Sequence, residues 1–93
     1  MDVSELRVTV DELDRKLVDL LNERARVVQN IGRLKRHTSM PIYEPDREHA
    51  VYRNVAEYNQ GPLRAQDLEI IYQALMAVMR EIQSHEILDA NEE

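Results

Sequence analysis

Apolar residues recur along the first third of the chain at alternating spacings of three and four positions. This pattern predicts one face of a helix that packs against other helices. The repeat extends from Val3 to Leu34 and is interrupted once, because Arg24 stands where an apolar residue is expected. An arginine is always charged, and burying an unpaired charge costs several kcal/mol. No acidic residue shares the stripe, so the pattern indicates an anionic ligand for Arg24, with a snorkelling arginine as the alternative.

Glycine and proline divide the chain into three predicted helices. The chain has two Gly and three Pro, and four of these five residues lie in two segments that are expected to be loops, 38–45 and 59–64. The predicted helices cover about 4–37, 45–58 and 65–88, and 89–93 is expected to be a frayed tail. At 1.5 Å per residue, the first helix would be roughly 50 Å long.

The length of 93 residues indicates a single domain, 1–93. Three helices of such unequal length do not close a compact monomer, because the first would project well past the other two. Two chains can solve this problem by packing their long helices together. We therefore expect an all-α fold that forms an intertwined homodimer.

Charge is unevenly distributed in this chain, whose net charge is −6. Within 23–36 the only acidic residue is Glu23, against five basic residues: Arg24, Arg26, Arg33, Lys35 and Arg36. An acidic protein with one basic zone suits a small anion better than a nucleic acid. Phe and Trp, which could stack on bases, are absent.

Other residue types narrow the chemistry further. The histidines lack the spacing of metal ligands, and there is no Cys and no phosphate-binding glycine loop, so we expect no cofactor. The acidic N-terminal stretch does not resemble a signal peptide or a membrane span. We therefore expect a cytoplasmic location and no membrane partner.

The spacing of three basic residues predicts how a ligand could be held. Lys35 lies eleven residues after Arg24, so their side chains point nearly the same way, roughly 16 Å apart along the helix. Such a pair can grip both ends of a small dianion. Arg7 is about 42 Å from Lys35 on the same helix, so it reaches that ligand only from an antiparallel partner chain. A helix C-terminal cation for Lys35 and a solvated Arg7 are the alternatives.

Five further positions could belong to the same site. Arg47 and Glu48 follow Glu44 at the start of the second helix, where acidic residues also suit the helix dipole. Gln83 ends an apolar stripe of the third helix, where it can donate a hydrogen bond to a ligand or lie near a frayed end. Gly32 either admits a ligand close to the backbone or allows close helix packing.

Four segments, in this order, resemble the all-helical class of chorismate mutases: LR (6–7), LDRKLVDLLNERARVVQNIGRLK (13–35), IYEPDRE (42–48) and IYQALMAVMREIQ (71–83). The resemblance covers residues 4 to about 86, and the blocks ER…GRLK and DRE are its most specific parts. It implies an intertwined dimer of three-helix chains with two sites. It also implies an isomerase that rearranges chorismate to prephenate, on the way to Phe and Tyr, without a cofactor or a covalent intermediate.

The resemblance also implies roles for individual residues. Arg24 would bind one substrate carboxylate and Arg7 of the partner subunit the other. Lys35 would hydrogen-bond the ether oxygen and help to hold a carboxylate, and Gln83 would contact the same ether oxygen.

The remaining site residues carry over in the same way. Glu48 would accept a hydrogen bond from the ring hydroxyl, Glu44 would lie near that hydroxyl, and Arg47 would bind substrate or order the site. Met79 departs from the pattern, because the family commonly has Ser or another small residue there. A methionine removes a hydroxyl contact and adds bulk.

Three other functions stay open from the sequence. The first is a mutase-like regulatory domain that binds prephenate or chorismate and controls a partner enzyme of the shikimate pathway, fused or separate; the segment NQGPL resembles mutase domains joined to such enzymes. The second is a lyase of the same fold that acts on isochorismate. The third is a non-catalytic helical dimerisation module, for which Arg24→Leu would leave function intact.

Overall fold

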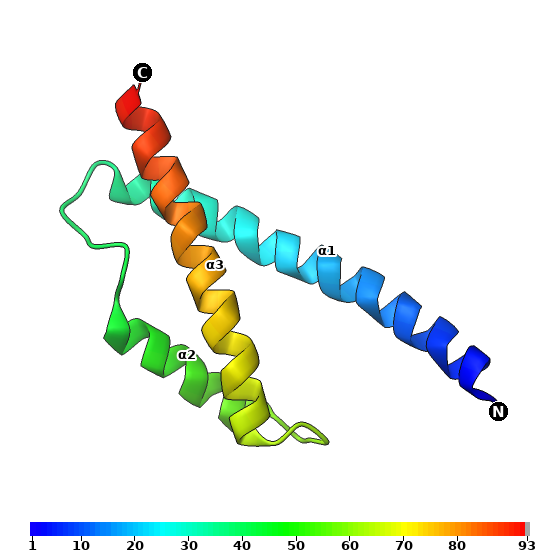
Figure 1. Ribbon diagram of the computed structural model, residues 1–93. Coiled ribbons are helices and arrows are strands. Elements are labelled where there is room, and N and C mark those ends of the chain that lie inside the picture. Colours follow the sequence, from blue (N-terminus) through cyan, green and yellow to red (C-terminus); the bar gives the residue numbers. More distant parts are fainter. Residues whose placement is uncertain (93) are drawn as a thin grey trace.

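The computed structural model describes residues 1–92, which form three helices: α1 (Val3–Lys35), α2 (Pro45–Tyr58) and α3 (Ala65–Glu92) (Figure 1). No strand occurs within 1–92, so the predicted all-α class is confirmed. The helix α2 has the expected bounds, and α1 ends two residues before the expected position. The predicted end of α3 at residue 88 was four residues too early, because no Gly or Pro follows to stop the helix. The last position of the predicted tail, 93, lies outside the described residues.

Local signals fix where the first two helices begin. At the start of α1, Asp2 Oδ1 accepts from the Glu5 backbone N–H at 2.9 Å, and Glu5 Oε2 accepts from the Asp2 backbone N–H at 3.2 Å. This capping box satisfies two backbone donors that the helix leaves free. Pro45 opens α2, where its missing N–H costs nothing.

The helix α3 packs against both other helices and so organises the fold. It crosses the C-terminal part of α1, while the N-terminal half of α1 projects away alone (Figure 1). At the crossing, a Cβ on Gly32 would lie 3.1 Å from Glu86 Cβ and 3.3 Å from Gln83 Cα. Glycine therefore allows the two helices to approach closely, as one of the sequence interpretations proposed.

Ion pairs secure the same crossing from its outer side. The Glu86 carboxylate lies 3.2 Å from Arg33 Nε and 3.0 Å from Arg36 Nη2. Arg36 Nε also donates to the Glu86 backbone carbonyl at 2.6 Å. These contacts fix the last turns of α1 against α3, which matters because this end of α1 carries Lys35.

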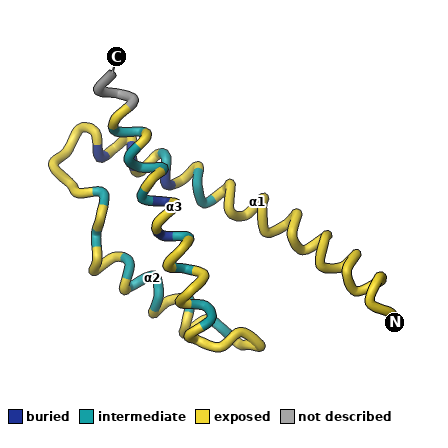
Figure 2. Tube along the Cα trace, in the orientation of Figure 1, coloured by how far each residue is buried: buried dark blue, intermediate teal, exposed yellow. Residues whose placement is uncertain are grey.

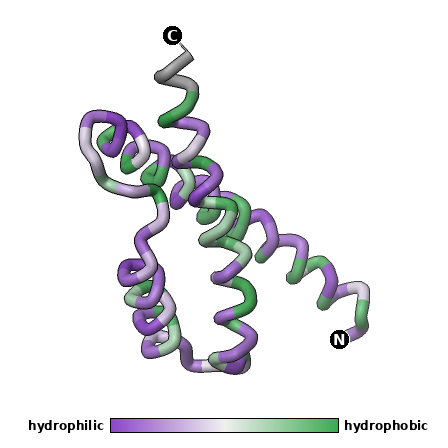
Figure 3. Tube along the Cα trace, turned by 60° about the vertical axis from the view of Figure 1, so that its left-hand side comes forward, coloured by the Kyte–Doolittle hydropathy of each residue, from purple (hydrophilic) through white to green (hydrophobic). Residues whose placement is uncertain are grey.

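A single chain has almost no core. The buried apolar side chains among the described residues are Val28, Met76 and Met79, and the first 23 residues are exposed throughout (Figure 2). The radius of gyration is 16.6 Å, against about 12 Å for a compact domain of this length. The accessible surface is 7548 Å², against roughly 5,600 Å² for a compact monomer of this mass. The chain is therefore extended and exposes much apolar surface, including stretches of α1 and α3 (Figure 3).

Candidate active site

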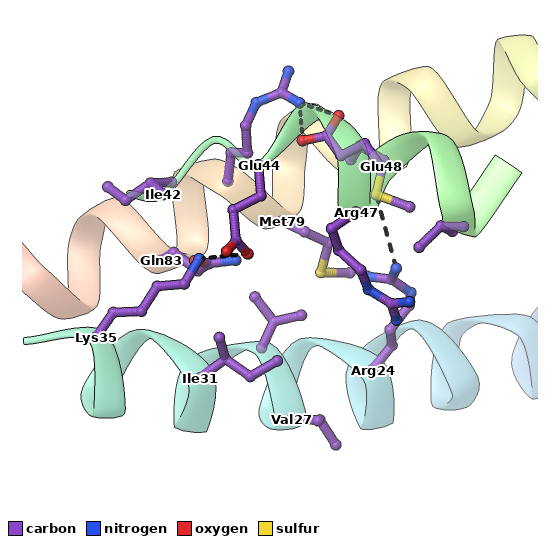
Figure 4. Close-up of a pocket in the computed structure, with 14 residues that line it drawn as sticks. Arg24, Val27, Ile31, Lys35, Ile42, Glu44, Arg47, Glu48, Met79 and Gln83 are labelled. Carbon is purple, nitrogen blue, oxygen red and sulfur yellow. Dashed lines mark hydrogen bonds and ion pairs between the residues drawn. The ribbon is translucent and has the colours of Figure 1, made fainter. Parts of the chain in front are cut away.

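A pocket of about 430 Å³ lies between the C-terminal half of α1, the first turns of α2 and the second half of α3 (Figure 4). Its volume is typical of a small-molecule site. All predicted site residues except Arg7 line it: Arg24, Lys35, Glu44, Arg47, Glu48, Met79 and Gln83. Three segments that are distant in sequence thus contribute polar side chains to one cavity.

Lys35 lies at one end of the pocket (Figure 4). Its side chain is 3% exposed, and Nζ donates to the Gln83 Oε1 at 2.9 Å, to the Pro41 carbonyl at 2.8 Å and to Glu44 Oε2 at 3.3 Å. An ammonium has three donors, so each has an acceptor here. A buried cation with this arrangement is not merely a charge at a helix C-terminus, which would face solvent.

The contact with Lys35 also orients Gln83. Because the amide oxygen of Gln83 accepts from Lys35, its NH₂ group is turned away from that ammonium. The end of the pocket near Lys35 therefore combines a cation with a neutral amide donor. Such donors bind an oxygen atom that gains negative charge.

Two guanidinium groups gather at the other end of the pocket. The side chains of Arg24, from α1, and Arg47, from α2, point toward one another in Figure 4. Arg24 Nη2 lies 3.9 Å from the sulfur of Met76, and no ion pair of Arg24 occurs within the described part of the chain. Two converging guanidinium groups without a carboxylate form a strong site for an anion.

Met79 lies between these two ends and is buried (Figure 4). Apolar side chains of α1 and the loop before α2, among them Val27, Ile31 and Ile42, complete the lining. A ligand bound against these side chains would exclude water from its contacts, which would strengthen the electrostatic interactions in the pocket. Met79 thus belongs to the wall, and it supplies bulk rather than a hydroxyl.

Glu48 enters the pocket from α2 and is held by a residue that the sequence analysis missed. Arg80 Nη1 donates to both carboxylate oxygens of Glu48 at 2.6 Å, and this hydrogen bond is the main cause that raises the pKa of Arg80. The pKa of the neighbouring Tyr52 is raised by burial first and by the charge of Glu48 second. A signal for Arg80 was available, because it lies four residues after Met76 and three before Gln83, on the face of α3 that carries the site.

The charges of the lining suit a dianion. Four cationic side chains and two carboxylates line the pocket, which leaves a formal charge of +2. A ligand with two negative charges would balance it.

Arg7 is the one predicted site residue that the chain does not bring to the pocket. It lies in the exposed first turns of α1, in the part that projects away from α3 (Figure 1). Within one chain, Arg7 therefore cannot reach a ligand that Lys35 binds, as the helical distance between them predicted.

Among the described residues, no group of three or more His, Cys, Asp or Glu side chains is arranged so that it could hold a metal ion. Within the same residues, no helix is both long enough and apolar enough to cross a membrane.

The fold and the pocket define an all-helical protein with a pocket whose lining has a net positive charge. The family model for chorismate mutase type II matches residues 6–84. The chain therefore belongs to the chorismate mutase type II family.

Individual relatives agree with this assignment. The bifunctional chorismate mutase/prephenate dehydratase of Pseudomonas aeruginosa is 35% identical over 77 residues, which are 77% of this chain and 21% of that protein. The chain thus spans about a fifth of the length of this relative.

Solved structures of chorismate mutases have the same fold. The enzyme from Helicobacter pylori in complex with prephenate is 27% identical, with a TM-score of 0.84, and the match covers 91% of this chain and 92% of that one. Chorismate mutase from Thermus thermophilus is 29% identical, with a TM-score of 0.85, and the match covers 88% and 93%.

Proposed function

We propose that this chain rearranges chorismate to prephenate. The observation that carries the proposal is the arrangement of one pocket, in which Lys35 and Gln83 lie at one end and Arg24 and Arg47 at the other. Chorismate is a dianion with an ether oxygen between two reacting parts. The pocket offers a cation and an amide for that oxygen, and guanidinium groups for a carboxylate.

Each proposed role rests on the position of the side chain. Arg24 and Arg47 bind one carboxylate, because their guanidinium groups converge without a protein carboxylate between them. Lys35 and the Gln83 NH₂ group donate to the ether oxygen, where negative charge grows as the C–O bond breaks. To do so, Lys35 gives up one of its three acceptors for the ether oxygen. Glu44 is the easiest acceptor to displace, because its oxygen is the most distant of the three from Nζ.

The start of α2 supplies the remaining contact. Glu48 accepts a hydrogen bond from the ring hydroxyl, and Glu44, which lines the same pocket beside Lys35, lies near that hydroxyl. Met79 shapes the wall against which the ring packs. Its bulk narrows the choice of ligand without contributing a hydrogen bond.

The chemistry requires no more than these groups. A pericyclic rearrangement needs no acid or base, so a site can act by holding the substrate in its reactive conformer and by stabilising the developing charge. A millionfold acceleration corresponds to about 8 kcal/mol. Positioning together with a cationic donor in a poorly hydrated pocket is of this magnitude.

We further propose that two chains form an intertwined homodimer in which the partner's Arg7 completes each site. The exposed surface exceeds that of a compact monomer by about 1,900 Å². Leu13, Leu17 and Leu20 of the apolar stripe are each more than half exposed. Burying this excess on both chains would give an interface of the size usual for obligate homodimers. A location in the cytoplasm stays a prediction from the sequence.

The direct test follows the absorbance of chorismate with purified protein. We expect Arg24→Ala and Lys35→Ala each to reduce kcat/KM at least about 1,000-fold, because each removes a charge that contacts the substrate. Arg26→Ala, an exposed change on α1 outside the pocket, serves as the matched control and should keep normal turnover. Near-normal activity of either site variant, with its dimer intact, would refute the assignment.

A regulatory role is the second candidate, and it is motivated by a bifunctional relative in which the matching segment is about a fifth of a protein that is also a prephenate dehydratase. In that role the domain would bind prephenate or chorismate and control a partner enzyme of the shikimate pathway. Turnover by the isolated chain would count against a purely regulatory role. Product analysis distinguishes a mutase from a lyase that acts on isochorismate. If the Arg24→Leu variant keeps the function of the wild-type protein, the chain is a dimerisation module.

A further inference from the structure

Arg80 on α3 contacts two other segments of the chain, α2 and the loop before it. Its Nη1 lies 2.6 Å from both carboxylate oxygens of Glu48 on α2. Its guanidinium carbon lies 5.1 Å from the centre of the Tyr43 ring, in the loop that leads to α2. The side chain of Glu48 is 16% exposed, so the ion pair is partly shielded from water. The proposed function uses Glu48 but leaves Arg80 without a role.

We propose that Arg80 is a positioning residue, which fixes the carboxylate of Glu48 as the acceptor for the ligand's hydroxyl group and keeps it away from the cations that bind the ligand's carboxylates. This inference rests on the proposed function, because it assumes that Glu48 contacts the hydroxyl.

Several cations of the pocket could compete with Arg80 for the Glu48 carboxylate. Glu48 shares its pocket with Arg24, Lys35 and Arg47, and a flexible carboxylate would pair with one of them. Such a pair would neutralise a cation that the ligand needs. Arg80 on α3 gives Glu48 a partner of its own, so Arg24 and Arg47 stay available for an anion.

Arg80 also holds the Glu48 carboxylate in one orientation. A glutamate side chain has several rotatable bonds, and holding it in one orientation costs conformational entropy. The two hydrogen bonds from Arg80 meet this cost before the ligand arrives. A carboxylate has about four acceptor positions, so one on each oxygen is still free for a hydroxyl.

A purely structural role is the competing explanation, since the ion pair also links α2 to α3. The two explanations differ in the property that Arg80→Met changes. Loss of a structural link lowers stability and leaves kcat/KM of the folded protein unchanged. Loss of a positioning residue lowers kcat/KM, and this effect disappears once Glu48→Gln has removed the carboxylate that Arg80 orients.

The experiment compares four proteins: wild type, Arg80→Met, Glu48→Gln and the double variant. We expect Arg80→Met to lower kcat/KM for chorismate about 10- to 100-fold, with a raised KM, because the freed Glu48 competes with the substrate. In the Glu48→Gln background the same change should alter kcat/KM less than about twofold. Arg80→Lys keeps the charge and should restore part of the loss.

Arg64→Met is the matched control. It removes the Arg64–Asp67 ion pair, whose Nε–Oδ2 distance is 2.9 Å, at the start of α3 and outside the pocket. We expect its kcat/KM to stay within about twofold of wild type. Thermal unfolding of every variant separates a loss of stability from a loss of positioning.

Two results would overturn the inference: an Arg80→Met protein with a lowered Tm but normal kcat/KM, or equal losses in both backgrounds. If the wild-type protein does not turn over chorismate, the proposed catalysis fails, and calorimetric titration with prephenate then tests Arg80 by itself. Equal prephenate affinity in wild type and Arg80→Met would reject the inference independently.

Discussion

At the scale of single residues, Lys35 and Gln83 form a pair of donors that suits the proposed reaction, which needs no proton transfer. The ammonium is buried and donates to three acceptors, one of which is the Gln83 amide oxygen. That contact leaves the amide NH₂ group as a second donor to the pocket. An amide has no proton to gain or lose near neutral pH, so this donor has the same form throughout that range.

The resulting prediction concerns pH. We expect kcat/KM to vary less than about twofold between pH 6 and 8, because Gln83 is not ionisable and arginines stay protonated. The hydrogen bond with Glu48 raises the pKa of Arg80, so this cation is retained even more firmly as pH rises through that range. The rate of chorismate loss across a series of buffers at constant ionic strength gives the profile. A steep alkaline decline that disappears on mutation of Glu44 or Glu48 would contradict the prediction.

At the scale of elements, the geometry of the site depends on where α1 crosses α3. Gly32 is the contact that lets the backbones approach, one turn before Lys35 and directly opposite Gln83. The crossing therefore sets the distance between Lys35 and Gln83, the two proposed donors to the ether oxygen. The ion pairs of Glu86 with Arg33 and Arg36 hold the same crossing from its outer side.

The prediction at this scale is that Gly32→Ala impairs activity. Alanine favours a helix over glycine by up to about 1 kcal/mol. Here, however, its Cβ would lie 3.1 Å from Glu86 Cβ and 3.3 Å from Gln83 Cα, and these atoms of α3 cannot rotate away. We expect α3 to shift by a few tenths of an ångström, with kcat/KM falling about tenfold and no gain in Tm. A raised Tm together with unchanged kcat/KM would show that the crossing tolerates a methyl group.

At the scale of the whole molecule, two features of one chain support the proposed homodimer. The chain leaves the apolar stripe of α1 exposed, and it leaves Arg7 far from the pocket. On α3, Ile71 and Val78 are also half exposed, while Met76 and Met79 face inward. A second copy that covers the stripe would remedy both, provided that it packs antiparallel along α1.

Mixed dimers test this arrangement directly. We expect Arg7→Ala and Arg24→Ala each to be nearly inactive alone. When the two proteins are unfolded and refolded together, each mixed dimer regains one intact site, because Arg24 of one chain meets the partner's Arg7. Random pairing predicts about a quarter of wild-type activity per chain. No recovery in mixtures that sedimentation shows to be dimeric would exclude a shared site.

Several features followed from the sequence because they depend on short-range rules. The three helices followed from apolar periodicity and from the placement of Gly and Pro, and the start of α2 from Pro45. The end of α3 was placed too early, because a polar ending without Gly or Pro carries no stop signal. The relation of Arg24 to Lys35 followed from helical geometry alone.

Only the tertiary structure decided which distant residues meet. From the sequence, the charge of Arg24 within an apolar stripe indicated an anionic ligand but not the residues around it. The three acceptors of Lys35 come instead from the loop before α2, from the N-cap of α2 and from α3. The contact of Arg80 with Glu48 joins positions 32 residues apart, and no periodicity within one helix predicts it. Local spacing determines which face of a helix a side chain occupies, whereas helix packing determines what that face contacts.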